Sequence, residues 1–260
     1  PDSVLAVATP NTRVLLVNSP ANPTGAVLDV TTLRALFEIA RERRWQVISD
    51  EAYEHFVYDG EHVSLASLER DVPVEERLVH STYTFSKSLA MTGYRLGYLA
   101  TANDRVARAV RIVQEANLIA MSTPVQYAGL AALAQSDQVR ANRAMVLANR
   151  DAVTPALREA GLLAAPPAGG WYALLDVRST GLGAEEFTRR LLDATNVAVV
   201  PGTGFAELPR LDARGRVTST LPAPRSRYLI RIALCVAPHV LQSGVDRLLE
   251  FAREHQGAAV

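Results

Sequence analysis

Short apolar runs alternate with an amphipathic segment over the first hundred residues of the chain. The runs at 13–17, 45–49 and 78–82 contain valine, isoleucine or leucine, and a polar or turn-forming segment follows each, as after strands. Apolar residues between 33 and 40 recur at helical spacing, which predicts a helix over about 31–43. This strand–helix–strand alternation implies an α/β fold, with a mostly parallel sheet and helices on its faces.

The second half of the chain changes to smaller units. Helices are expected first, over 103–116, 124–134 and 138–159, and the last is long enough to connect two domains. Beyond Pro166 and Pro167 the expected elements are strands at 172–177, 197–200 and 228–234, and helices at 184–194 and 240–254. We therefore expect a large domain over residues 1–140 and a smaller C-terminal α+β domain over 141–260, which includes the long helix.

The charge balance argues against several classes of partner. The chain has 27 basic and 27 acidic residues, so no strong field favours nucleic acid or an anionic membrane surface. Its five histidines are scattered without zinc-ligand spacing. Cys235 is the only cysteine, which excludes an internal disulfide framework and fits a reducing, cytoplasmic environment. No apolar run reaches membrane-spanning length, and no signal peptide is recognisable.

Polar side chains follow the three expected strands of the first domain. They are Asn22 after the first strand, Asp50 and Tyr53 after the second, and Thr84, Ser86 and Lys87 after the third. Ligands of open α/β sheets bind beyond the carboxyl ends of the strands, so adjacent strands would direct these groups to one place. Each group alone has a simpler interpretation, as a turn, a helix cap or a solvated lysine. Their shared position favours a binding site.

At these positions the sequence resembles the class I/II aminotransferases, which are pyridoxal-phosphate enzymes of fold-type I. Five segments occur in the family's order: 18–25 (Asn-Ser-Pro-Ala-Asn-Pro-Thr-Gly), 49–54 (Ser-Asp-Glu-Ala-Tyr-Glu), 84–98 around the lysine, 201–205 (Pro-Gly-Thr-Gly-Phe), and Arg231 with Ile232. One segment alone is weakly specific, but the ordered set spans almost the whole chain. The resemblance implies an aminotransferase whose large fold-type I domain is incomplete in this chain.

The resemblance assigns the chemistry to Lys87 and Asp50. Lys87 would bond covalently to the cofactor aldehyde and then move a proton, as general base, between the substrate Cα and the cofactor C4′. Asp50 would pair with the pyridine nitrogen and keep it protonated, so that the ring can accept electrons.

The resemblance also assigns the remaining cofactor contacts. Asn22 and Tyr53 would hydrogen-bond the phenolic oxygen and stabilise its anion. Arg95, eight residues after the lysine, would hold the phosphate together with a hydroxyl from Thr84 or Ser86. Thr84 stands where the family often has serine, and it keeps the hydroxyl.

Arg231 lies inside the apolar run 228–234, Tyr-Leu-Ile-Arg-Ile-Ala-Leu. An unpaired guanidinium in an apolar strand is costly, so an anionic partner is expected. The resemblance implies bidentate recognition of the substrate α-carboxylate, which suits the fork geometry of arginine. A structural ion pair is the alternative.

Two further features favour structural interpretations. The segment 208–226 contains several arginines and is longer than the family pattern predicts. We expect a solvated surface loop there rather than a lid over a site. Trp171 and Tyr172 follow two glycines, and we expect a core aromatic pair at the start of a strand rather than a substrate contact.

Members of this family carry a substantial N-terminal portion before the segment where this sequence begins with Pro1. That portion would supply an aromatic ring that stacks on the pyridine, a second phosphate-binding loop and a tyrosine from the partner chain of a homodimer. We therefore interpret the sequence as part of a longer, homodimeric protein. We expect these 260 residues alone to retain the cofactor weakly and to catalyse poorly.

Three functions fit these residues. The first is transfer of an amino group between an L-amino acid and a 2-oxo acid. The second is β-elimination, cyclisation or another carbanion reaction, because the cofactor supplies the chemistry and the pocket selects the outcome. The third is the sensor domain of a transcription regulator, which an N-terminal winged-helix segment would reveal. The segment 118–121 lacks the arginine of one dicarboxylate-specific subgroup, which argues against that subgroup's mode of aspartate binding.

Overall fold

The computed structural model describes residues 1–256, which form two compact units. Unit 1 comprises Pro1–Ala21 and Ala26–Arg143, and unit 2 comprises Asn22–Gly25 and the chain from Ala144 onwards. The helix α5 (Ser136–Glu159) contributes residues to both units. Among residues 1–256, no helix is both long enough and apolar enough to cross a membrane.

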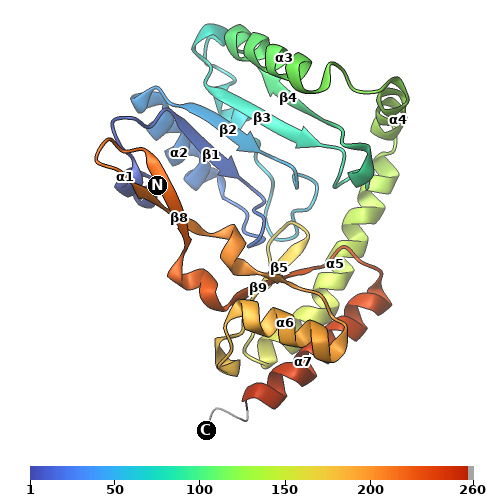
Figure 1. Ribbon diagram of the computed structural model, residues 1–260. Helices are drawn as coiled ribbons and strands as arrows, with labels where there is room; N and C mark the ends of the chain where they lie inside the picture. Colours follow the sequence, from blue (N-terminus) through green and yellow to red (C-terminus); the bar gives the residue numbers. More distant parts are fainter. Residues whose placement is uncertain (257–260) are drawn as a thin grey trace. The chain divides into compact units, whose positions relative to one another are not determined.

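Unit 1 contains a four-stranded sheet in the order β1-β2-β3-β4 (Figure 1). The strands β1 (Val14–Asn18), β2 (Gln46–Asp50) and β3 (Val79–Thr84) are parallel, and β4 (Gly97–Thr101) is antiparallel to β3. The prediction of a mostly parallel sheet is therefore confirmed. The strand β4 was not predicted, because its residues were assigned only to the segment around the lysine.

The helix α2 (Val30–Arg43) covers one face of this sheet (Figure 1). Its apolar residues pack with those of β1, β2 and β3 in one buried cluster that includes Val17, Leu33, Leu36, Phe37, Ala40, Val47 and Val79. Burying a side chain the size of valine or leucine contributes about 1.5–3 kcal/mol. The Asp29 carboxylate caps the helix by accepting from the Thr32 N–H at 2.7 Å. Packing and capping thus fix the helix that supports β1 and β2.

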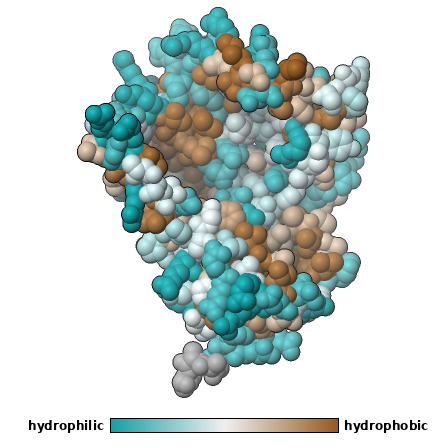
Figure 2. All heavy atoms as spheres, viewed as in Figure 1, coloured by the Kyte–Doolittle hydropathy of each residue, from teal (hydrophilic) through white to brown (hydrophobic). Residues whose placement is uncertain are grey.

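The opposite face of β1 and β2 is apolar and open to solvent. Val14, Leu16 and Ile48 are 49%, 64% and 36% exposed, and Figure 2 shows hydrophobic surface over these strands. Because alternate residues of the same strands lie in the core, both faces are apolar. This is the pattern of strands in a sheet that is covered on both sides.

The remaining elements of unit 1 surround the sheet. The helices are α1 (Asp2–Val7), α3 (Asp104–Leu118) and α4 (Thr123–Leu133), and the 3₁₀ turns are η1 (Leu65–Glu69), η2 (Val74–Glu76) and η3 (Thr92–Tyr94). The helix α1 was not predicted, and its Val4 packs against the cluster under α2.

Unit 2 is an α+β unit, as predicted. Its antiparallel sheet has the order β5-β9-β6, formed by β5 (Tyr172–Asp176), β9 (Leu229–Ala233) and β6 (Val200–Pro201). The helices α6 (Ala184–Thr195) and α7 (Pro238–Gln256) pack through an edge-to-face contact between Phe187 and Phe251. The strand expected over 197–200 pairs only from Val200 onwards, because an apolar run predicts extended backbone but not its partner.

The arginine-containing segment after β6 is exposed, as predicted for a solvated surface loop, but it forms a β-hairpin that was not predicted. β7 (Glu207–Leu211) pairs with β8 (Val217–Pro222), and all residues of both strands are exposed, as expected for this segment. The Asp212 carboxylate accepts from the Arg214 and Arg216 N–H groups, and Gly215 adopts φ 72°. Asp and Gly at these turn positions were the overlooked hairpin signal. The 3₁₀ turns of this unit are η4 (Arg178–Thr180), η5 (Gly202–Phe205) and η6 (Pro224–Tyr228).

Candidate active site

Parallel pairing brings the carboxyl ends of β1, β2 and β3 to one edge of the sheet in unit 1. Asn18 lies opposite Asp50, and Asp50 lies opposite Thr82. Segments at or beyond this edge carry the predicted site residues of unit 1, namely Asp50, Tyr53, Thr84, Ser86, Lys87 and Arg95. The alignment matches the strand pattern of the sequence, and this is the edge at which α/β sheets bind ligands.

Asp50 ends β2 and is half-buried. Its Oδ1 accepts a hydrogen bond of 3.2 Å from the Ala52 N–H, which forms the turn after the strand. In the same turn Tyr53 is buried to 3% exposure. Because a turn and not a helix follows β2, the alternative of Asp50 as a helix cap is wrong.

Lys87 lies in the loop that connects β3 to β4. The Ala90 N–H donates to the Lys87 carbonyl at 3.0 Å, which closes the loop tightly at this residue. The Lys87 Nζ lies 5.5 Å from the centre of the Tyr53 ring. Lys87 is also the only lysine among the 260 residues, since every other member of the lysine-plus-arginine set is arginine. Any reaction of this chain that requires a lysine amine must therefore use Lys87.

Thr84 and Ser86 shape the loop that holds this lysine. The Thr84 Oγ1 accepts from the Ser86 N–H at 3.1 Å and donates to the Leu96 carbonyl at 3.5 Å. The Ser86 carbonyl accepts from the Thr92 hydroxyl at 2.8 Å, and Ser86 is 7% exposed. The two residues thus connect the start of the loop to its end.

Arg95 lies at the end of the same loop and is exposed. Its backbone is left-handed, with φ 54°, a conformation that costs a non-glycine residue about 1–2 kcal/mol. Its Nη1 donates to the Thr92 carbonyl at 2.7 Å. A strained residue at a ligand-binding edge is a candidate for function.

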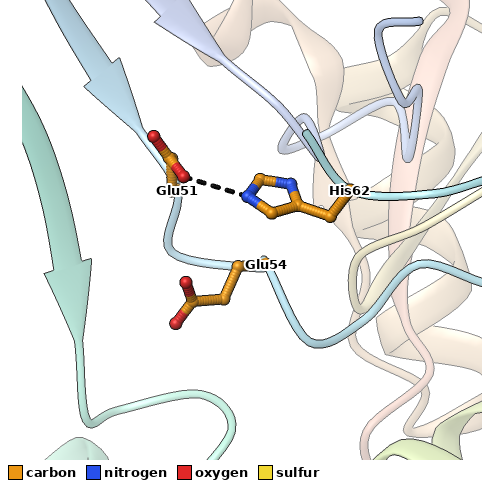
Figure 3. A group of neighbouring side chains, drawn as sticks. All are labelled: Glu51, Glu54 and His62. Carbon is orange, nitrogen blue, oxygen red and sulfur yellow. Dashed lines mark hydrogen bonds and ion pairs between the residues drawn. The ribbon is translucent and has the colours of Figure 1, made fainter. Parts of the chain in front are cut away.

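Glu51 is a buried carboxylate with a complete set of hydrogen bonds, and sequence reasoning missed it. It is 2% exposed. Its Oε1 accepts from the Ser64 and Ser81 hydroxyls at 3.0 and 2.8 Å. Its Oε2 accepts from the Tyr83 hydroxyl at 3.3 Å and pairs with the His62 Nε2 at 2.9 Å (Figure 3). Glu51 therefore ties the end of β2 to β3 and to the 62–64 segment.

Opposing effects act on the two carboxylates of this turn. Burial by itself would raise the pKa of Glu51, but hydrogen bonds from His62 and Ser81 outweigh burial and hold that pKa below its ordinary value. Burial raises the pKa of Glu54.

Ligand atoms of Glu51, Glu54 and His62 lie within 4.8 Å of one another. Since both Glu51 oxygens already accept two hydrogen bonds, the group is an internal network rather than a metal centre.

In unit 2, Arg231 occupies the centre of β9. It lies opposite Leu174 of β5 on one side and Val200 of β6 on the other. Its Nη1 donates to the Asn22 Oδ1 at 2.8 Å. Within residues 1–256, no carboxylate forms an ion pair with Arg231, so the alternative of a structural ion pair is wrong for the described part of the chain.

Two aromatic rings pack on the Arg231 guanidinium. The Cζ atom is 4.0 Å from the centre of the Tyr172 ring and 4.4 Å from that of Phe205. Tyr172 begins β5, as predicted, but Tyr172 and Trp171 are both only partly buried, so the prediction that they form a core pair was wrong. Phe205 was noted only as part of a family segment, and no local signal in the sequence indicates which side chain its ring contacts.

Comparisons with known proteins agree with this architecture. Residues 3–232 match the family model described as aminotransferase class I and II. Aromatic-amino-acid aminotransferase 2 of Thermococcus litoralis is 34% identical over 97% of this chain and 60% of its own length. The arginine–pyruvate transaminase of Pseudomonas aeruginosa is 36% identical over 91% of this chain and 59% of its own length.

A solved structure shows the same fold. The aromatic aminotransferase from Pyrococcus horikoshii aligns with a TM-score of 0.81 and 34% identity, covering 97% of this chain and 63% of that one. The chain spans about 60% of the length of the curated relatives it matches. With the family model matched over most of its residues and the fold shared, the chain belongs to the class I and II aminotransferase family, whose members have the fold-type I architecture.

Proposed function

We propose that the protein is a pyridoxal-phosphate-dependent aminotransferase that moves an amino group between an L-amino acid and a 2-oxo acid. One observation carries this proposal. The only lysine of the chain, Lys87, follows β3 at the sheet edge where the neighbouring β2 ends in Asp50. An amine and a carboxylate at adjacent strand ends are the two groups that the family's chemistry needs.

The side chains of this edge fit a phosphorylated pyridine aldehyde. An amine can bond to the aldehyde, a carboxylate can pair with a ring nitrogen, and hydroxyl and guanidinium groups can bind a phosphate. The loop with Lys87 also carries Thr84, Ser86 and Arg95. When bound, pyridoxal phosphate supplies a ring that accepts the electron pair released at the substrate Cα.

Each residue then has a defined task. Lys87 would hold the cofactor through a covalent bond from its Nζ to the aldehyde carbon, and once the substrate amine has replaced that bond, the freed Nζ would serve as the base that moves the proton between the substrate Cα and the cofactor C4′. Asp50 keeps the proton on the pyridine nitrogen, and Tyr53 donates to the phenolic oxygen, the role also assigned to Asn22.

The phosphate and the substrate are bound by arginines in this proposal. Arg95 binds the phosphate with a hydroxyl from Thr84 or Ser86. Arg231 binds the substrate α-carboxylate. The absence of a carboxylate partner for Arg231 within residues 1–256 supports this role, because the charge then remains available to an anion from outside.

The relatives favour transamination over β-elimination, cyclisation or a sensor role, because those compared are named as aminotransferases or transaminases. Their names refer to aromatic amino acids and to arginine with pyruvate. The proposal therefore extends to L-amino acids as a class and to no single side chain. The resemblance further supports a homodimer, which sedimentation of the purified protein tests, and the single cysteine, Cys235, fits a cytoplasmic location.

Borohydride reduction tests the cofactor site. The complete gene product, loaded with pyridoxal phosphate, is reduced and digested, and the peptides are mapped by mass spectrometry. We expect a pyridoxyl group on Lys87. An adduct on another residue, or a protein that retains no cofactor, contradicts the assignment.

A panel of amino donors tests the reaction. Each donor is incubated with 2-oxoglutarate or pyruvate, and formation of glutamate or alanine is measured. Transamination produces the new amino acid in proportion to the enzyme. Release of ammonia without a new amino acid would instead indicate β-elimination.

A further inference from the structure

We infer that Tyr172 and Phe205 are positioning residues for Arg231, and that their rings hold the guanidinium in the orientation in which it accepts the substrate carboxylate. This inference rests on the proposed function of Arg231. It adds two residues whose contribution acts through Arg231 rather than through direct contact with the reacting atoms.

The two rings reach Arg231 from the strand β5 and from the 3₁₀ turn η5, which follows β6. Tyr172 lies on β5, two residues from Leu174, which is the ladder partner of Arg231. Diagonal neighbours across an antiparallel pair lie on one face and are within reach of aromatic and long side chains. Phe205 ends η5, the 3₁₀ turn that follows β6, whose Val200 pairs with Arg231 on the other side. The sheet register thus places the Tyr172 ring, and the turn after β6 places the Phe205 ring.

The kind of group that contacts Arg231 determines whether its guanidinium can still bind the substrate carboxylate. A carboxylate of the protein would hold Arg231 in place but neutralise its charge and occupy its donors. Aromatic faces stabilise a cation without neutralising it. The Asn22 Oδ1 takes one N–H of Nη1 at 2.8 Å, and the guanidinium has five N–H donors. Rings and one amide oxygen therefore fix the side chain while its charge and remaining donors stay available to an anion.

A second arginine–aromatic contact of unit 2 provides a control. The Tyr228 ring contacts Arg178 and Arg227, with Cζ atoms 5.4 and 5.5 Å from the ring centre. These distances are longer than the 4.0 and 4.4 Å at Arg231. Both Arg178 and Arg227 are exposed. Removing the Tyr228 ring perturbs a surface contact of the same type without touching Arg231.

The experiment measures KM for the amino donor, kcat and the absorbance of bound cofactor in the complete enzyme. The variants are Tyr172→Leu, Phe205→Leu and the double variant, with Tyr172→Phe, Tyr228→Leu and Arg231→Leu for comparison. We expect KM to rise about 5-fold for each leucine variant and about 20-fold for the pair, as the loss of a partly exposed cation–π contact predicts. The kcat and the cofactor absorbance should change less than 2-fold, and Tyr172→Phe, which keeps the ring, should restore KM.

The outcomes separate this inference from the proposed function. If Arg231→Leu raises KM and neither leucine variant does, the positioning role is wrong while the function of Arg231 stands. If Arg231→Leu leaves KM unchanged, the proposed function of Arg231 fails first. A rise of KM in Tyr228→Leu equal to that in Tyr172→Leu also overturns the inference. Phe205 is 37% exposed, so Phe205→Leu keeps the test available if Tyr172→Leu does not fold.

Discussion

The two units of the chain place their candidate residues by different means. In unit 1, Asp50 and Lys87 stand at or just beyond strand ends, where the parallel alignment of β2 and β3 determines the position. In unit 2, Arg231 stands in the middle of β9 with a ladder partner on each side. A residue in a turn is placed by topology and local hydrogen bonds, whereas one inside a strand is placed by register. A slip of one residue would move Arg231 to the other face of its sheet.

The two units also differ in how the protein contacts a charged side chain of each, Glu51 in unit 1 and Arg231 in unit 2. Glu51 of unit 1 is saturated by four donors of the protein. Arg231 of unit 2 contacts two rings and one amide oxygen. Removing one partner of a buried, paired charge destabilises a protein, because the remaining polar groups are left buried without a partner. Removing Glu51 should therefore cost stability, and removing Arg231 should cost binding.

Lys87→Ala should produce the largest effect, because in the proposed function it removes both the covalent attachment and the general base. We expect kcat to fall about 10⁴-fold, the upper range for a general base. Stopped-flow or steady-state transamination assays measure this loss, and thermal unfolding checks that the variant folds. A Lys87→Ala enzyme with more than about 1% of the normal kcat would contradict the role of unit 1 in the chemistry.

Asp50→Ala should lower kcat about 10²–10³-fold while some cofactor stays bound, by analogy with removing one electrostatic group from a transition state. Asp176→Ala is the matched control from unit 2. Asp176 also ends a strand, and its Oδ1 accepts from the N–H two residues later, at 2.9 Å. The Asp176→Ala control should keep the normal kcat. Equal losses of kcat in the two variants would show that Asp50 of unit 1 has no catalytic role that Asp176 of unit 2 lacks.

Arg231→Leu should act on binding rather than on cofactor retention. We expect kcat/KM for amino donors to fall, with a loss of about 2–3 kcal/mol in transition-state stabilisation. This is the lower range for a charged pair, because Arg231 is half-buried. Arg178→Leu, which removes an exposed arginine that also contacts a tyrosine ring, is the control and should leave KM unchanged. If both variants behave alike, Arg231 has no special part in recognition.

Glu51→Gln should reduce stability by about 2 kcal/mol in the free energy of unfolding, because the amide cannot accept all four hydrogen bonds. Glu54→Gln, in the same turn, should change stability by less than about 0.5 kcal/mol. Urea unfolding at pH 7 measures both. A larger loss from Glu54→Gln would show that the network is not centred on Glu51.

The pH dependence sharpens this prediction. The pKa of Glu51 lies below its ordinary value of 4.5 in the folded protein, so its contribution to stability is present above that pH. The contribution is lost as pH falls through the folded pKa, because protonation removes the charge that accepts the hydrogen bonds. The stability difference between the wild type and Glu51→Gln should therefore shrink below about pH 4.5, as urea midpoints over a pH series will show.

The elements that the sequence predicted are those with a strong local pattern. The helix α2 follows from apolar spacing, and β1 to β3 follow from apolar runs that end in polar or turn residues. The strand β4 was missed because its residues were assigned only to the segment around the lysine, and the β7–β8 hairpin was missed because it is entirely exposed. An exposed strand has no buried face, so it lacks the alternation that identifies strands.

The candidate-site residues also fall into two groups, those identified from the sequence and those whose partners only the structure revealed. Lys87, Asp50 and Arg231 were identified because they lie in ordered segments that resemble a family. Glu51 and Tyr172 were not assigned a partner, because each bonds to residues far away in the sequence. Glu51 bonds to Ser81 and Tyr83, about thirty positions further along the chain, and Tyr172 of β5 contacts Arg231 on the neighbouring strand β9.

The sequence by itself determined the α/β class, the polar groups that follow each strand and the family to which those segments belong, because apolar periodicity and short motifs are local properties of a chain. The tertiary structure decided which groups satisfy one another. It alone showed that Glu51 is saturated within unit 1 and that Arg231 is held by two rings in unit 2. The physical reason is that hydrogen bonds and cation–π contacts act over a few ångströms, and only the folded arrangement of strands and turns brings such distant residues within that range.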